Sequence, residues 1–358
     1  MLLEAAFRGL IAPLLEESCE ARPLHVINMT LNLVKGEELA WQDRKAQSFT
    51  VSPLHAGSPF DVGYRRSKNY AIDLKQSGAI SLGTSMAISG TAANFNMSYH
   101  PSPVMTFLLA LFSIRLGWWL GNPGQAGAAT HSQPGPLFAP RPLIAETLSQ
   151  MNNDHPYIYL SDGGHFENLG LYEMVLRRCR FIVVSDGSQD KDFDFESLVN
   201  AINKIRIDLG VRITFDSIPI SPREKKIPTF AKTTKEEKKK KYCAVGRIHY
   251  SEVDENGMDR FLLYIKPAIY GTEPADIQNY ARANPAFPHE STGNQMYSET
   301  QFENYRALGF HEVSVIAPNR ASKSRIGLKE MFRQVYEEYL GEEAPAELRD
   351  SVRTSYLP

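Results

Sequence analysis

Two aspartates followed by glycine are the residues best placed to do chemistry. Asp162 precedes Gly163 and Gly164, and Asp186 precedes Gly187. Both follow short apolar runs typical of buried strands, and open α/β sheets bind ligands at the carboxyl ends of their strands. A carboxylate there can act as a general base toward a nucleophile, and the two glycines after Asp162 let a substrate or another backbone come close. Asp-Gly pairs also mark ordinary turns, and local sequence alone does not separate the two aspartates.

The sequence predicts no partner nucleophile for these aspartates. No G-x-S-x-G occurs, and the nearest approximation, residues 83–87 around Ser85, lacks the second glycine. Cys19, Cys179 and Cys243 are far apart and form no C-x-x-C. We interpret them as reduced thiols of a cytosolic protein, and the nucleophile stays unknown.

Cofactor and metal patterns are also missing from the sequence. The glycines around Asp162 do not follow G-x-G-x-x-G spacing, and there is no P-loop motif. His165 and Glu167 beside Asp162 allow an alternative reading as a metal hydrolase, but no H-E-x-x-H pairing supports it. We therefore expect neither a cofactor nor a metal.

The elements that would position Asp162 and Asp186 alternate between strand and helix. Residues 157–160 and 181–185 have strand composition, with helical spacing between them over 169–178. A second helix, capped by Asp194 and ended by Gly210, precedes a strand at 211–215. This order predicts an α/β fold with a mostly parallel sheet flanked by helices.

The C-terminal third predicts a β-hairpin followed by helices. Two strand-like segments, 242–250 and 260–266, flank a turn that contains Asn256-Gly257. Ser298 is positioned to cap a helix ending before Gly309, and residues 328–340 have the spacing of a final helix.

Composition and charge exclude several classes of function. The chain has 358 residues with 39 Lys+Arg against 41 Asp+Glu, so its net charge of -2 gives no general attraction to nucleic acid. Residues 104–120 form the longest apolar stretch, which Arg115 and Gly117 interrupt. We interpret it as a buried or interfacial helix whose Trp118 and Trp119 suit lipid headgroups. The charged segment 222–241 is expected to be a surface loop, with a lipid-headgroup patch as the alternative.

Several segments of the chain resemble bacterial patatin-like proteins related to the cytosolic phospholipases. The first is YIYLSDGGHFENLGLYEMVLRRCRFIVVSD, which contains the Asp-Gly-Gly triplet. Residues 23–57, 87–123 and 264–309 resemble the same family, in the same order along the chain. Together these segments cover most of the sequence.

The resemblance implies a serine acyl hydrolase with a Ser–Asp dyad and no histidine. Carried over, Asp162 is the base that activates the serine, and Gly163 and Gly164 complete its motif. The family's glycine-rich oxyanion loop and G-x-S-x-G serine would lie before this region, and neither occurs in the sequence. Residues 1–18 read as an amphipathic helix without a cap, so the expectation is a C-terminal portion of a longer protein.

The sequence thus predicts a lipid acyl ester hydrolase, phospholipase-like, of which this chain supplies the aspartate and lacks the serine. The substrate would be a phospholipid or another acyl ester, with membrane contact but no nucleic acid. The alternative is a noncatalytic lipid-associated or scaffolding remnant of the same fold. We expect one patatin-like domain over 1–358, with sheet and helices in 1–220, a charged loop in 221–241 and the hairpin and helices in 242–358. Without a secretory signal, a cytoplasmic location with membrane association is expected.

Overall fold

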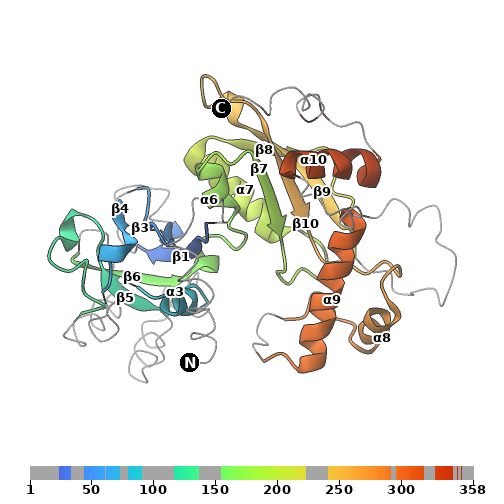
Figure 1. The fold of residues 1–358 in the computed structure, drawn as a ribbon, viewed down its shortest axis with the longest axis horizontal. Coiled ribbons are helices and arrows are strands. Elements are labelled where there is room, and N and C mark those ends of the chain that lie inside the picture. The colour runs from blue at the N-terminus through green and yellow to red at the C-terminus, as the bar shows by residue number, and fades with distance from the viewer. Residues whose placement is uncertain are drawn as a thin grey trace. The chain divides into compact units, whose positions relative to one another are not determined.

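The computed structural model divides the chain into two compact units, Met1–Asn168 and Leu169–Pro358. Figure 1 colours the helices and strands of both units by residue number, from blue at the N-terminus to red at the C-terminus. The structure describes residues 24–33, 44–60, 62–72, 80–90, 117–136, 155–222, 241–291, 296–317, 327–341, 345 and 348.

The first unit is built on a six-stranded antiparallel sheet with the order β4-β3-β2-β1-β6-β5. Its strands are β1 (Ile27–Asn32), β2 (Ala46–Val51), β3 (His55–Gly57), β4 (Tyr64–Arg66), β5 (Trp118–Gly121) and β6 (Tyr157–Asp162). Every strand pairing in this sheet is antiparallel, including that of β1 with β6, in which Met29 lies opposite Asp162. Because β1 lies between β2 and β6, segments far apart in sequence meet at the centre of this sheet.

The two faces of this sheet differ in chemistry. One face packs into an apolar core that includes Met29, Leu31, Phe49 and Leu160. Helix α3 (Leu82–Ser89), capped by the Ser81 hydroxyl, adds Ile88 to that core. Alternation along the strands turns small polar side chains to the other face, and these are also buried: Thr30, Asn32, Ser48, Thr50 and Ser161.

The second unit contains a four-stranded mixed sheet with the order β7-β10-β9-β8. Its strands are β7 (Phe181–Ser185), β8 (Arg212–Phe215), β9 (Cys243–His249) and β10 (Arg260–Ile265). β7 and β10 run parallel, whereas β9 is antiparallel to both β10 and β8. The hairpin predicted between 242–250 and 260–266 is therefore confirmed.

Helices cover this sheet and extend beyond it. α6 (Leu171–Leu176) and α7 (Glu196–Leu209) pack together next to the sheet, and α10 (Leu328–Gln334) continues into a π-helical segment, Val335–Leu340. Phe332 of α10 meets Phe181 of β7 with ring centroids 5.2 Å apart. α8 (Ala275–Ala283) and α9 (Glu299–Ile316) enclose a small core of their own around Phe287 and Leu308.

The predicted mostly parallel, patatin-like sheet is wrong. β6 and β7 belong to different sheets, so the βαβ unit expected over residues 157–185 does not exist, and the β7–β10 pair supplies the parallel pairing in the described part of the chain. The physical reason is burial. β6 reads as a continuous apolar run because the structure buries it on both faces, which is the pattern usually produced by a parallel strand.

Three local predictions also differ from the structure. The cap of α7 falls on Phe195 and not Asp194, because the Asp190 carboxylate accepts the N–H groups of both residues. Ser298 does cap α9, but the helix continues through Gly309 to Ile316, since buried Leu308 and Ile316 extend its packed side. The helix expected over 104–120 does not include its last residues, because Trp118–Gly121 is strand β5.

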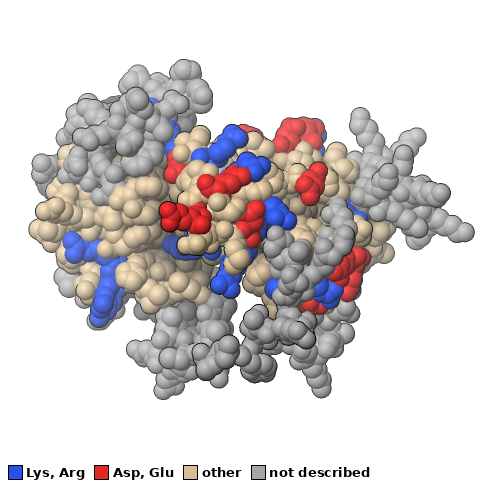
Figure 2. All heavy atoms as spheres, turned by 90° about the horizontal axis from the view of Figure 1, so that it is seen from above, with Lys and Arg blue, Asp and Glu red and all other residues tan. Residues whose placement is uncertain are grey.

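Other predictions fall partly or wholly on residues outside the described ones: the helix at 1–18, Cys19, residues 104–116, and residues 223–240 of the charged segment. Among the helices that are described, none is both long enough and apolar enough to cross a bilayer. On the face seen in Figure 2, basic and acidic side chains of the described residues are interspersed.

Candidate functional site: the Asp-Gly-Gly turn

Asp162 ends β6, and its carboxylate is anchored on one side only. Oδ1 accepts the backbone N–H of Gly164 at 2.6 Å, which closes a tight turn into a 3-10 segment, Gly163–His165. The side chain is half-buried and, by its pairing with Met29, lies on the sheet face that holds the apolar core. Within the described residues Oδ2 accepts no hydrogen bond. One oxygen thus fixes the carboxylate and the other can take a proton.

The two glycines are required by close approach of neighbouring atoms. A Cβ on Gly163 would lie 2.8 Å from the backbone oxygen of Asn28, and a Cβ on Gly164 would lie 2.2 Å from Asn168 Oδ1. A side chain at Gly163 would require the backbone of the turn to move, whereas one at Gly164 would require the Asn168 side chain to shift. The sequence prediction that this turn brings another backbone close is confirmed.

The turn is held to β1 by a threonine that the sequence analysis missed. Thr30 Oγ1 donates to the backbone oxygen of Gly163 at 3.3 Å and accepts the N–H of Phe166 at 2.9 Å. Thr30 is fully buried, and its polar side chain alternates with apolar Met29 and Leu31. That alternation was the available signal, although nothing local indicates which turn Thr30 supports.

His165 also anchors the turn. Its Nδ1 lies 3.0 Å from the hydroxyl of Ser161, which in turn accepts from Asn32 Nδ2 at 2.9 Å. Because Asn32 donates to the hydroxyl, the hydroxyl proton is available for His165 Nδ1. Ser161 is completely buried, so this chain of hydrogen bonds positions the turn and presents no hydroxyl to solvent.

Asp186 directly follows β7 and, like Asp162, accepts an N–H two residues on, but in a different environment. Its Oδ1 accepts from the N–H and hydroxyl of Ser188, and its Oδ2 accepts from the Tyr264 hydroxyl at 2.5 Å and Lys266 Nζ at 3.0 Å. Burial raises the pKa of Asp186, but the bonds from Ser188 and Tyr264 and the charge of Lys266 outweigh it and leave the pKa below its ordinary value. Lys266 is itself fully buried and also faces Asp190 at 3.4 Å. A carboxylate with four donors is well suited to structure and poorly suited to proton transfer.

Among the described residues, the hydroxyl and thiol groups considered as nucleophiles form no hydrogen bond with Asp162. Ser85 is buried and donates to Ser81 within α3. Ser89, at the end of α3, donates at 2.7 Å to the Asn28 carbonyl, the same oxygen that crowds Gly163. Cys243 is buried, which raises its thiol pKa to about 12 and keeps it unreactive.

The alternative metal set is not assembled. Across the part of the chain that the structure describes, no three His, Cys, Asp or Glu side chains gather as metal ligands, and Asp162, His165 and Glu167 are all within that part. Comparison with known protein families and with curated proteins found no match to this chain.

Proposed function

We propose that Asp162 is the general base of an acyl ester hydrolase. The observation that carries the proposal is the asymmetric carboxylate, with one oxygen fixed by Gly164 N–H and the other without a hydrogen bond in the described residues. A base needs a fixed position and a free lone pair, and both are present here. The Asp-Gly-Gly resemblance to patatin-like hydrolases supports the same role, although the turn follows a strand of an antiparallel sheet and not of the expected mostly parallel one.

The reaction would begin with proton transfer from a hydroxyl to Asp162 Oδ2. The oxygen attacks the ester carbonyl, the alcohol leaves with the proton, and water releases the acid in a second step. The nucleophile stays unassigned, because the sequence contains no G-x-S-x-G.

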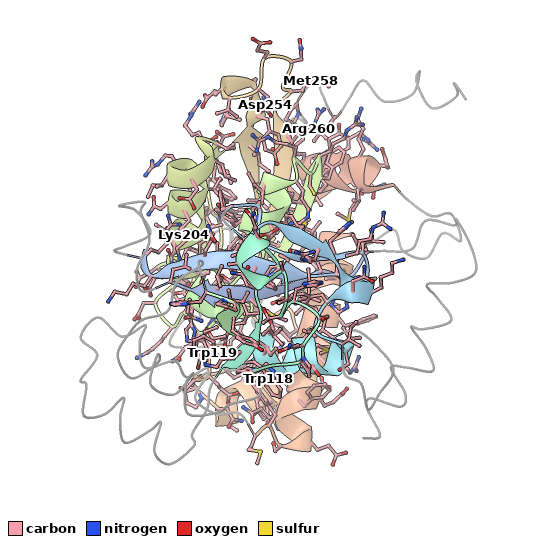
Figure 3. All side chains as sticks on the ribbon, turned by 90° about the vertical axis from the view of Figure 1, so that its left-hand side faces the viewer. Trp118, Trp119, Lys204, Asp254, Met258 and Arg260 are labelled. Carbon is pink, nitrogen blue, oxygen red and sulfur yellow. The ribbon has the colours of Figure 1, made fainter. Side chains whose placement is uncertain are left out.

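A lipid ester is the proposed substrate class. Trp118 is 49% exposed on β5, which lies at the end of the strand order, and Figure 3 labels it beside Trp119. Trp119 packs on Tyr159 with centroids 5.2 Å apart, which holds the pair in place. Tryptophan is favoured where protein meets lipid headgroups, because its ring is apolar and its N–H is polar.

The test compares two aspartate variants in the complete protein as its gene encodes it. Asn accepts the Gly164 N–H as Asp does but cannot take a proton, so Asp162→Asn should lower the hydrolysis of a neutral long-chain p-nitrophenyl ester by at least ~10²-fold. The matched control is Asp186→Asn, which also follows a strand and accepts an N–H two residues on. Rates are compared per folded molecule, measured by circular dichroism.

Full activity in Asp162→Asn would overturn the assignment. So would a folded Asp186→Asn protein that has lost turnover. Absence of turnover by the wild type, on this ester and on phospholipid vesicles, would favour the noncatalytic alternative.

A further inference from the structure

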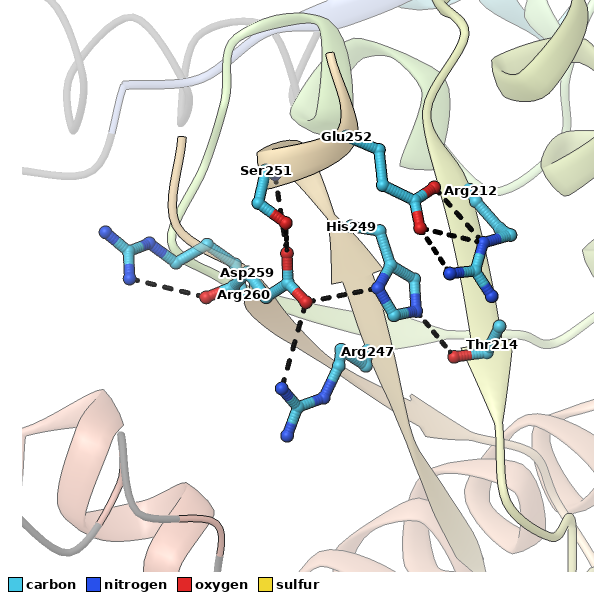
Figure 4. Close-up of polar contacts among 8 residues, drawn as sticks. All are labelled: Arg212, Thr214, Arg247, His249, Ser251, Glu252, Asp259 and Arg260. Atoms are coloured by element: carbon cyan, nitrogen blue, oxygen red, sulfur yellow. Dashed lines mark hydrogen bonds and ion pairs between the residues drawn. The ribbon is translucent and has the colours of Figure 1, made fainter. Parts of the chain in front are cut away.

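A hydroxyl, an imidazole and a carboxylate form a continuous relay on the mixed sheet of the second unit. Thr214 Oγ1 on β8 lies 2.9 Å from His249 Nε2 on β9, and His249 Nδ1 lies 3.1 Å from Asp259 Oδ2, just before β10. Figure 4 shows the imidazole between the other two side chains. The order is that of a nucleophile, a base and the group that orients the base.

The strand register explains why these side chains share one face. Arg212 pairs with His249 and Thr214 pairs with Arg247, and directly opposed residues project from the same face. The side chains of Arg212 and Arg247 therefore lie on the same face of the sheet as the hydroxyl. The side chain of Arg212 is 51% exposed, and that of His249 is 14% exposed. Thr214 is itself partly buried, beside a largely enclosed imidazole.

The charge state of Asp259 determines which ring nitrogen of His249 carries the proton. Burial raises the pKa of Asp259, but the hydroxyl and N–H of Ser251 and the nearby His249 and Arg247 lower it below its ordinary value. An ionised carboxylate only accepts, so it favours the proton on His249 Nδ1. Nε2 then carries the lone pair and accepts from the Thr214 hydroxyl.

We propose that Thr214, His249 and Asp259 form a second reactive site, in which the Thr214 hydroxyl accepts the acyl group of an ester that carries a negative charge. The Thr214 oxygen bonds to the ester carbonyl carbon while its proton passes to His249 Nε2. The bond to the leaving alcohol breaks, and that alcohol takes the proton from His249. Water then attacks the acyl-threonine with His249 as base, which releases the acid and restores the hydroxyl.

The two arginines determine the substrate preference. Arg247 lies directly across from Thr214 and Arg212 lies two residues before it. Arg212 also forms an ion pair with Glu252, which holds it on this face. Arg247 in turn lies 3.8 Å from Asp259, so each guanidinium group is held beside a carboxylate. In the proposed reaction their N–H groups would donate to the developing oxyanion and to an anionic acyl chain. A neutral ester would gain only the first of these effects.

The chain contains a matched control for this relay. Thr272 Oγ1 lies 3.4 Å from His311 Nε2, so it also has a histidine partner. Within the described residues no carboxylate is hydrogen-bonded to His311. Thr272 also shares a hydrogen bond with the Tyr242 hydroxyl at 2.8 Å, so the two threonines differ in that partner as well as in the group that orients the base.

The experiment treats the full chain with a fluorophosphonate probe and maps the modified peptide by mass spectrometry. We expect modification of Thr214 but not of Thr272, loss of it in Thr214→Val, and retention in Thr214→Ser. Asp259→Asn should slow labelling at least ~10²-fold, because Asn favours the wrong tautomer. Asp162→Asn should leave the Thr214 labelling rate unchanged, which separates this site from the proposed Asp162 site.

The substrate preference has its own measurement. The mono-p-nitrophenyl ester of succinate should acylate the chain at least ~5-fold faster than p-nitrophenyl acetate, and Arg247→Gln should remove the difference. Equal rates for the two esters would overturn the charge preference. No modification at Thr214, equal modification at Thr272, or labelling unaffected by Asp259→Asn in a folded protein would overturn the site.

Discussion

At the scale of single residues, the chain uses similar side chains for different purposes by changing what surrounds them. Asp162 ends β6 and Asp186 directly follows β7, and each accepts an N–H two residues on. Asp186 forms an ion pair with buried Lys266, whereas Asp162 keeps one oxygen free of hydrogen bonds among the described residues. The second environment allows proton transfer, and the first one stabilises a fold.

A buried glutamate should make stability depend on pH. Burial, together with the charge of Glu273, raises the pKa of Glu312 to about 8, although Glu312 also accepts the Ala268 N–H, which lowers it. The folded state therefore holds a proton between pH ~4.5 and ~8 that the unfolded state releases. The contribution of Glu312 to stability is complete at acid pH and falls as pH rises through this window, by at most about 5 kcal/mol.

The variant Glu312→Gln keeps the acceptor for Ala268 and stays neutral, so its stability should fall less between pH 5 and 9. Urea unfolding at several pH values measures the difference from wild type. Exposed Glu303, which is paired with Arg306, provides the control variant Glu303→Gln. Identical pH profiles for wild type and Glu312→Gln would show that Glu312 is ionised in the fold.

At the scale of elements, the turn after β6 is the most constrained connection near the candidate site. Gly163→Ala places a methyl group 2.8 Å from the Asn28 backbone oxygen, and we expect it to cost about 1–3 kcal/mol of stability. Gly187 follows Asp186 in the same way but has nothing within 4 Å of its would-be Cβ. Gly187→Ala should change stability by less than about 0.5 kcal/mol. Urea unfolding of both variants checks this, and equal costs would contradict it.

Elements defined by neighbouring residues were predictable from the sequence. The strand at 181–185, the hairpin around β9 and β10, the Ser298 cap and the stop at Gly210 all depend on residues a few positions apart. The same holds for the close-packed Asp162-Gly163-Gly164 turn. Each of these signals is local, so it survives without knowledge of the fold.

Sheet membership was not predictable, because it depends on distant partners. β6 pairs with β1, and Thr30 reaches Gly163 across 133 positions. The relay around His249 is a similar case, because Thr214 reaches His249 across 35 positions. Its members come from β8, β9 and the turn before β10, and no spacing rule connects them. Such sites appear only when strand register is known.

At the scale of the whole molecule, the two units differ in how local their pairings are. In the second unit, β9 and β10 meet through a short connection, with Ile248 opposite Arg260. In the first unit, the central β1–β6 pairing joins segments more than a hundred residues apart. Closing the longer loop costs about 2 kcal/mol more in chain entropy.

The hydrogen bonds between Thr30 and the turn therefore affect the order in which the structure forms during folding. The geometry of Asp162 depends on hydrogen bonds between Thr30 and a turn more than a hundred residues later in the chain. Because contacts between distant segments form slowly, this geometry should be among the last features to form during refolding. Pulse-labelling hydrogen exchange should show the Phe166 amide, which donates to Thr30, gaining protection after the amides of the β9–β10 hairpin. Simultaneous protection would mean that both sheets form in one step. Later protection of Phe166 would mean that a newly made chain lacks the Asp162 turn until β1 and β6 have paired.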